Sequence, residues 1–193
     1  MIEWIIANRI EIVGAILAFV YIILEIKQKW TFWIASIISS SFYVYIFFDT
    51  KLYAEMGLNM YFIVMAAYGL YCWKLSPNRN AAHRDFHFIS QKTALRLAAI
   101  AFIVSGFLFF ILSNYTDSPV PAPDAIIAAL SILATWMVAK KIVECWYVWI
   151  ITDVFATGLY LHQNLYPTAV LFAAYSILSV VGLIEWRKLV ISD

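Results

Sequence analysis

The sequence predicts an all-α integral membrane protein with seven transmembrane helices, and three observations support this fold class. Of the 193 residues, 64% are hydrophobic and 13% are charged, which leaves too little polar surface to cover a soluble globule. Uncharged runs at 30–48, 56–73 and 97–116 are each long enough to cross the ~30 Å hydrocarbon core as a helix. Lys and Arg residues gather in alternate loops, as they do in polytopic membrane proteins.

The helices are placed in order by the apolar runs that lie between charged or turn-forming residues. The predicted spans are 10–26, 30–48, 53–74, 93–113, 124–140, 145–162 and 166–187. The first and fifth have the shortest uncharged stretches, so their flanking charges must extend to the membrane interface. The first span lacks the basic start and the small-residue cleavage site of a signal peptide, and we expect it to be retained.

The basic residues predict the orientation of these spans. With the N-terminus outside, all but Arg9 and Lys51 of the 13 Lys and Arg residues fall on the inner side. The sequence therefore predicts an N-terminus outside, a C-terminus inside, and a long inner loop over 76–91.

An internal repeat relates the two ends of the chain at a displacement of 113 residues. The matches include Leu52-Tyr53 with Leu165-Tyr166, Gly69 with Gly182, and Trp73-Lys74 with Trp186-Arg187. Within the second span, a three-residue adjustment pairs Trp30 and Trp33 with Trp146 and Trp149. The repeat predicts a 3+1+3 arrangement, because three helices in each half correspond and the fourth helix lies between them.

We therefore expect one membrane domain over 1–193, with three-helix bundles at 10–74 and 124–187 and a linker helix at 93–113. The two bundles start an even number of spans apart, so the repeat is parallel, with an axis along the membrane normal. Such repeats place a substrate site at their interface near the bilayer midplane. The alternative is that duplication only built a stable helical bundle.

Asp153 is the most informative polar residue, since it lies about 10 Å from the cytoplasmic start of the span 145–162. A carboxylate at that depth costs at least about 2.5–3.5 kcal/mol unless it is paired or hydrated. The neighbouring spans supply no obvious buried Lys or Arg. We expect Asp153 to face the protein interior and to meet a cationic ligand, a proton or water. The alternative is a neutral Asp that joins two helices by a hydrogen bond to Ser or Thr.

The same span carries a stripe of candidate binding residues at i, i+3 and i+4 steps: Trp146, Trp149, Asp153, Thr157 and Tyr160. Flat rings alternate with polar groups along this stripe. A small aromatic cation fits such a surface, because it can stack on indole, gain cation–π attraction and pair with the carboxylate.

Three further residues are predicted to bind substrate: Trp33 and Ser40 in the second span and Asn59 in the third. Ser40 belongs to a run of small hydroxyl residues that alternatively serves close helix packing. An unpaired amide in lipid is costly, which favours a pocket position for Asn59. Four other indoles stand at span ends, where such rings anchor the membrane interface: Trp4, Trp30, Trp73 and Trp186.

Several function classes are excluded or disfavoured by the sequence. The net charge of +1 gives no sign of a nucleic-acid partner, and no Gly-rich phosphate-binding loop is present. His83 and His87 have i, i+4 spacing, but no acidic base lies where a metalloprotease helix requires it. No nucleophile and base pair suggests catalysis. We therefore expect no metal site, no cofactor and no enzymatic activity.

Short motifs in three spans carry a resemblance to a known family. They are Leu58-Asn59-x-Tyr61 and Gly69-x-Tyr71-x-Trp73, then Lys140-Lys141-x-x-Glu144-x-Trp146-x-x-Trp149, and finally Leu165-Tyr166 and Gly182 to Trp186. At these motifs nearly the whole chain resembles the Pnu family of bacterial vitamin transporters. The resemblance implies a fold related to the SWEET sugar transporters and facilitated diffusion across the bacterial inner membrane. It also implies that a cytoplasmic kinase traps the vitamin and that Asn59, Trp146, Trp149 and Asp153 surround it.

The residue at position 153 bears on the substrate. In the family members that carry nicotinamide riboside, Asn is expected where Asp153 stands here. A carboxylate can balance the thiazolium charge of thiamine and accept from its aminopyrimidine, so thiamine is slightly favoured. Nicotinamide riboside is also a flat cation and is the alternative. SWEET-like sugar transport and a non-transporting heptahelical sensor are the more distant hypotheses.

Overall fold

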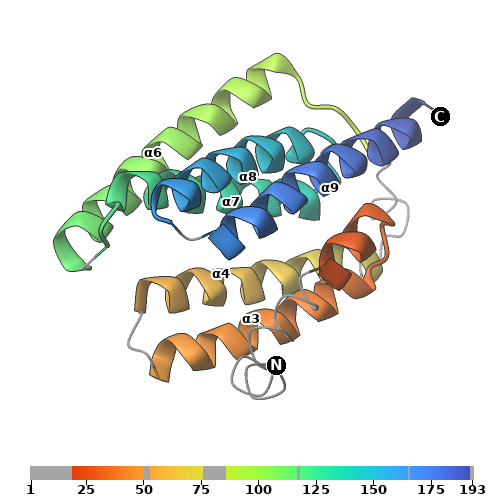
Figure 1. Ribbon diagram of the computed structural model, residues 1–193. Helices are drawn as coiled ribbons and strands as arrows, with labels where there is room; N and C mark the ends of the chain where they lie inside the picture. Colours follow the sequence, from red (N-terminus) through yellow and green to blue (C-terminus); the bar gives the residue numbers. More distant parts are fainter. Residues whose placement is uncertain (1–18, 50–52, 76–85, 117, 165, 192–193) are drawn as a thin grey trace. The chain divides into compact units, whose positions relative to one another are not determined.

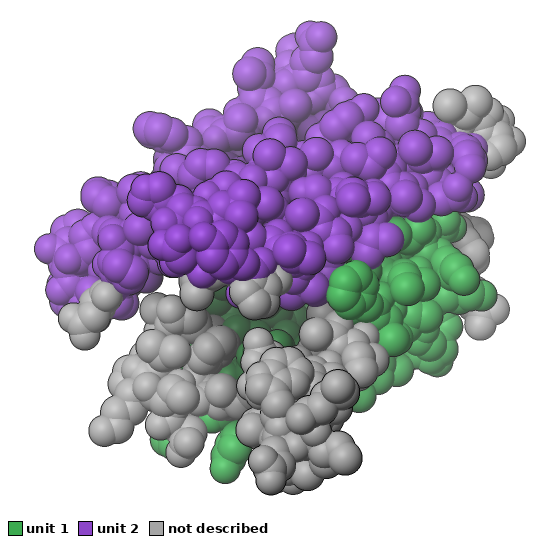
Figure 2. Space-filling view, viewed as in Figure 1, with its two compact units in different colours: residues 1–75 green, residues 76–193 purple. Residues whose placement is uncertain are grey.

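The computed structural model describes residues 19–49, 53–75, 86–116, 118–164 and 166–191. Within these ranges the regular structure is helical, apart from one isolated bridge between His87 and Ile142. The chain divides into two compact units, Met1–Leu75 and Ser76–Asp193 (Figure 2). Each unit is described below by itself.

The described residues of the first unit form three α-helices and one π-helical segment (Figure 1). A helix is described over 19–26, followed by α3 (Thr31–Asp49) and α4 (Tyr53–Leu70). The last turn of α4 widens into the π-helical segment η1 (Tyr71–Leu75). Helices α3 and α4 pack along each other and form the core of this unit.

The described residues of the second unit form four helices in sequence (Figure 1). They are α6 (Gln91–Tyr115), α7 (Pro121–Ala139), α8 (Cys145–His162) and α9 (Tyr166–Ile191). Each packs on the next, with the most extensive contact between α8 and α9. Ser90 caps α6 by accepting a hydrogen bond from the Thr93 amide at 3.3 Å.

The predicted spans agree with these helices to within a few residues, and the all-helical membrane fold is confirmed. The fifth helix begins at Pro121 rather than at Asp124, because proline is well suited to the first turn of a helix. The predicted first span, 10–26, lies mostly outside the described residues, and its described part, 19–26, is helical. The division into a linker helix and two three-helix bundles stays a prediction.

Four helices in the described part of the chain are long and apolar enough to cross a membrane: Met56–Lys74, Gln91–Tyr115, Pro121–Ala139 and Thr168–Val190. Helix α6 shows why, since Leu97 is its one buried residue while Phe102 and Ile103 are 81% and 68% exposed. Apolar side chains in such positions fit a lipid environment. Helix α8, which carries Asp153 in its interior, is not among the four.

The turn before the second helix of each repeat has the same backbone conformation in both units. Gln28 and Lys141 stand 113 positions apart and have φ of 53° and 58°, in the left-handed region. The same pair of hydrogen bonds closes each turn. They are Gln28 N to Glu25 O and Lys29 N to Leu24 O, both 2.9 Å, then Lys141 N to Val138 O at 2.9 Å and Ile142 N to Met137 O at 3.0 Å. The predicted displacement of 113 residues is thereby confirmed in local structure.

Each unit also contains a tryptophan socket, in which an indole from the second helix of the repeat lies against a glycine and a tryptophan of the third. The first socket is Trp33, Gly69 and Trp73, and the second socket is Trp146, Gly182 and Trp186. The indole pairs meet edge to face, at 6.0 Å and 85° in the first socket and at 5.2 Å and 88° in the second. These contacts fit the geometry that aromatic pairs prefer.

The sockets correct two sequence-based interpretations. The three-residue adjustment that paired Trp33 with Trp149 is wrong, because the uninterrupted displacement pairs Trp33 with Trp146. Trp186 is not an interface anchor, since it is fully buried between Trp146 and Phe86, whose ring centroid is 4.6 Å away.

The segment before α6 is held against the second socket and the start of α8. The His87 amide donates to the Lys141 carbonyl at 3.3 Å, and the Val143 amide donates to the His87 carbonyl at 3.1 Å. The Ile89 amide donates to Oε1 of Glu144 at 2.9 Å. This part of the predicted inner loop is therefore ordered by backbone pairing and by a carboxylate.

Candidate substrate-binding site

Helix α8 has one buried face and one exposed face. Trp146 and Asp153 are 0% and 4% exposed, whereas Ile151 and Val154 are 61% and 58% exposed. The buried residues of α8 include two members of the predicted stripe, Trp146 and Asp153, while Trp149, Thr157 and Tyr160 are half-buried. Asp153 therefore does not face lipid, as the sequence predicts.

The Asp153 carboxylate meets a hydroxyl from the neighbouring helix. Ser179 of α9 is 1% exposed, and its Oγ donates to Oδ2 of Asp153 at 3.1 Å. No ion pair to Asp153 occurs among the described residues. A carboxylate has lone pairs on two oxygens, so this one bond leaves accepting capacity for a second partner. The contact also matches the alternative prediction of a hydrogen bond between helices.

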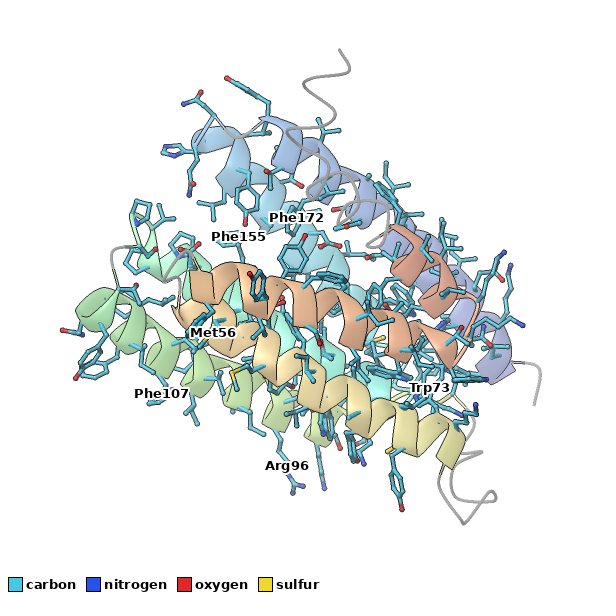
Figure 3. The ribbon with its side chains drawn as sticks, turned by 90° about the horizontal axis from the view of Figure 1, so that it is seen from below. Met56, Trp73, Arg96, Phe107, Phe155 and Phe172 are labelled. Carbon is cyan, nitrogen blue, oxygen red and sulfur yellow. The ribbon has the colours of Figure 1, made fainter. Side chains whose placement is uncertain are left out.

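Two other members of the stripe have defined partners. The Thr157 hydroxyl donates to the Asp153 carbonyl at 2.7 Å and is used within its own helix. The Tyr160 ring lies against Phe172 of α9, with centroids 5.2 Å apart and an interplanar angle of 37°. Figure 3 labels Phe172 of α9. The ring contact between Tyr160 and Phe172 thus continues the stripe away from Asp153.

Trp149 and Trp146 differ in their surroundings although both were predicted to bind substrate. Trp146 is enclosed by Gly182 and Trp186 within the second socket. Trp149 stands one turn before Asp153 and is half-buried. Its buried indole Nε1 has no hydrogen-bond partner among the described residues, as is also true of Trp33 and Trp146. An unpaired buried donor costs about 1–3 kcal/mol, so Trp149 has a donor that a ligand can satisfy.

The remaining predicted residues lie in the first unit. Trp33 is 1% exposed inside the first socket, and Ser40 is 6% exposed on α3. Asn59 is half-buried on α4. The other five predicted residues lie on α8 of the second unit: Trp146, Trp149, Asp153, Thr157 and Tyr160. Trp33, Ser40 and Asn59 belong to the first unit, which is described separately.

Sequence reasoning missed Ser179 and Ser176 of α9. The Oγ atom of Ser176 is buried and has no hydrogen-bond partner among the described residues. Ser176, Ser179 and Gly182 follow steps of three residues and therefore share one helix face. The sequence signal that could have located both serines is their three-residue spacing from Gly182, which the repeat had already matched to Gly69.

The described residues contain no group of three or more His, Cys, Asp or Glu side chains that could hold a metal ion. His83, one of the two histidines considered above, lies outside the described residues. The backbone of His87 is engaged in the bridge to the turn before α8.

Comparison with known proteins places this architecture in a family. A model of the nicotinamide mononucleotide transporter family matches residues 8–188. The chain belongs to the nicotinamide mononucleotide transporter family. It is therefore a multi-pass membrane transporter, and the resemblance to the Pnu family is confirmed.

Curated relatives and a solved structure cover nearly the whole chain. The nicotinamide riboside transporter PnuC of Escherichia coli (strain K12) is 23% identical over 201 residues, which are 92% of this chain and 84% of the relative. The protein of the same name from Neisseria mucosa is 23% identical over 188 residues, covering 92% and 72%. A crystal structure described as the vitamin B3 transporter PnuC has a TM-score of 0.73 at 23% identity and covers 92% of this chain and 80% of that one. This likeness supports the fold.

The comparisons give no support to the preference for thiamine. The two curated relatives are named for nicotinamide riboside, which was the alternative. Their names describe transporters, in agreement with the expectation that this family member is not an enzyme.

Proposed function

We propose that this transporter carries nicotinamide riboside across the membrane. The observation that supports this most strongly is the match of the named nicotinamide riboside transporters over 92% of this chain. The family model itself is named for the mononucleotide, which differs from the riboside by a phosphate. The charges near the candidate site help to choose between these two.

The charge distribution favours the unphosphorylated vitamin. A phosphate monoester carries about two negative charges at pH 7 and needs Arg, Lys or several amide donors. Asp153 is the charged residue between the ends of α8, and α9 has no charged residue before Glu185. A phosphate close to the Asp153 carboxylate is repelled, whereas a pyridinium ring is attracted.

The stripe on α8 supplies the other elements of recognition. Trp149 offers an indole face for stacking and an unpaired Nε1 donor. Asp153 offers the free accepting capacity of a buried carboxylate. Thr157 and Tyr160 of the same helix are assigned to the same ligand as part of the proposal. The assignment of Asn59 and Ser40 stays a prediction from the sequence, and Trp33 and Trp146 are enclosed in their sockets.

Thiamine is the competing ligand, because a buried Asp153 can pair with its thiazolium as well as with a pyridinium. Both are flat aromatic cations, so charge alone does not distinguish them. Asp153 stands where Asn is expected in the members that carry nicotinamide riboside, and this difference favours thiamine. The proposal nevertheless favours nicotinamide riboside because of the named relatives, and it makes thiamine the principal comparison in any binding measurement.

The wider setting follows from the family resemblance. The proposed location is the bacterial inner membrane, with the N-terminus outside and the C-terminus inside. Transport is proposed to be facilitated diffusion, with a cytoplasmic kinase that phosphorylates the vitamin and traps it.

Calorimetric titration of the purified chain with nicotinamide riboside, thiamine and glucose tests the proposal. We expect nicotinamide riboside to bind at micromolar concentration and at least about tenfold more tightly than thiamine, a difference of about 1.4 kcal/mol. Uptake of labelled riboside by liposomes that contain the chain is the second measurement. Tighter binding of thiamine or glucose, or riboside binding without uptake, would contradict the proposal.

A further inference from the structure

The pairing of Asp153 with Ser179 bears on which form of the vitamin is accepted. The Ser179 hydroxyl has one proton, and it donates this proton to Oδ2 of Asp153 at 3.1 Å. Both side chains are at least nine-tenths buried between α8 and α9. The hydroxyl therefore holds one carboxylate oxygen in place and leaves the other to accept from a ligand.

When Asp153 is ionised, its carboxylate accepts hydrogen bonds and cannot donate them. A ligand group that meets Asp153 must then be an N–H or O–H donor, or a positive charge. A carboxamide satisfies this requirement through its NH₂ group, whereas a carboxylate in the same place supplies a second negative charge. Two carboxylates close together in a site with little water repel each other strongly.

We infer that the Asp153–Ser179 pair makes this transporter select the carboxamide form of the pyridine riboside and reject the carboxylic acid form. The inference rests on the proposed function and specifies the substrate class of that site. Asp153 supplies the discriminating charge, and Ser179 is a positioning residue that orients the carboxylate. Even where the acid withdraws to about 6 Å from Asp153, the repulsion corresponds to about 100-fold in affinity.

The test is a titration of the purified full chain with two probes, nicotinamide riboside and the riboside of nicotinic acid. The expected result is that the acid binds at least about 100-fold more weakly than the amide. Asp153→Asn keeps the shape and removes the charge, so we expect the two affinities to come within about fivefold of each other. Asp153→Ser is a second charge-free variant, for use where the Asn side chain of Asp153→Asn impairs folding. It introduces the residue type found at the repeat-related position Ser40.

Ser179→Ala separates orientation from charge. The carboxylate remains, so the preference for the amide is retained, but amide binding weakens by about fivefold because the carboxylate is no longer held. Thr152→Val is the matched control. Thr152 is 1% exposed beside Asp153, and its hydroxyl donates to the Val148 carbonyl at 2.8 Å rather than to the carboxylate. We expect this variant to bind both probes as the unaltered chain does.

The outcomes distinguish this inference from the proposed function. Equal binding of the two probes by the unaltered chain, or discrimination that survives both charge-free variants, overturns the inference and leaves nicotinamide riboside as substrate. The same holds if Asp153→Asn and Ser179→Ala lower only the unfolding temperature, since the pair then merely joins two helices. Failure of the unaltered chain to bind nicotinamide riboside overturns the proposed function, and the inference with it.

Discussion

The two repeat halves share a packing framework and differ in their polar chemistry. The turn before the second helix and the tryptophan socket recur at a displacement of 113 residues. At the same displacement, however, the residues around Asp153 in the second half are matched by residues of different chemistry in the first. Trp149, Asp153, Ser176 and Ser179 correspond to Ser36, Ser40, Ile63 and Ala66. Duplication has preserved what holds each half together, and the carboxylate with its hydroxyl partner is confined to one half.

The largest expected effect is the loss of stability when the socket tryptophan of either half is removed. Trp33→Ala and Trp146→Ala each empty a fully enclosed indole position, and such truncations cost about 3–5 kcal/mol of unfolding free energy. Because the sockets are equivalent, the two variants should lose similar stability. Thermal unfolding of the purified protein, followed by size-exclusion chromatography, measures the loss. Tyr147→Ala, an exposed ring beside Trp146, is the control and should change little.

Trp149→Ala tests the unshared chemistry and should behave differently from Trp146→Ala. Trp149 is half-buried and lies outside the socket, so its removal should leave the unfolding temperature nearly unchanged. Riboside affinity should fall by about 10- to 100-fold, because a stacking surface and an indole donor are lost. Titration and thermal unfolding on the same preparations separate the two roles. If Trp146→Ala loses binding at full stability, the second socket is part of the ligand site.

A smaller effect is expected from glycine substitutions that fill the sockets. A Cβ at Gly182 would lie 2.5 Å from the Trp146 ring, and one at Gly69 would overlap the Trp33 ring. Either alanine must displace a rigid indole, which costs about 1–3 kcal/mol. Gly158→Ala on α8 is the matched control, since nothing lies within 4 Å of its added Cβ. If Gly182→Ala proves as stable as Gly158→Ala, the socket side chains move aside at no measurable cost.

The sequence was sufficient to predict much of this arrangement. Uncharged runs located the helix ends, and the depth of Asp153 predicted its buried side chain. The tryptophan register was not determined, because Trp30-x-x-Trp33 fits Trp146-x-x-Trp149 as well as the uninterrupted displacement fits Trp33 to Trp146. Ser179 was missed because its partner is 26 residues away, and the contact depends on how α8 and α9 rotate against each other.

The smallest expected effect concerns the shared turn. Gln28 and Lys141 adopt positive φ, which costs an L-residue with a side chain about 1–2 kcal/mol and costs glycine almost nothing. Gln28→Gly and Lys141→Gly should each raise the unfolding free energy by about 0.5 kcal/mol, after subtraction of the entropy of glycine in the unfolded chain. Lys140→Gly is the control, and it should lower the unfolding free energy. Lys140 has φ of −89°, so glycine there relieves no backbone strain. Thermal unfolding of the three variants should therefore show two small increases and one small decrease. A decrease at Lys141 with an increase at Gln28 would mean that the Lys141 ammonium, 5.6 Å from the Phe86 ring, stabilises the second half by a contact that the first half lacks.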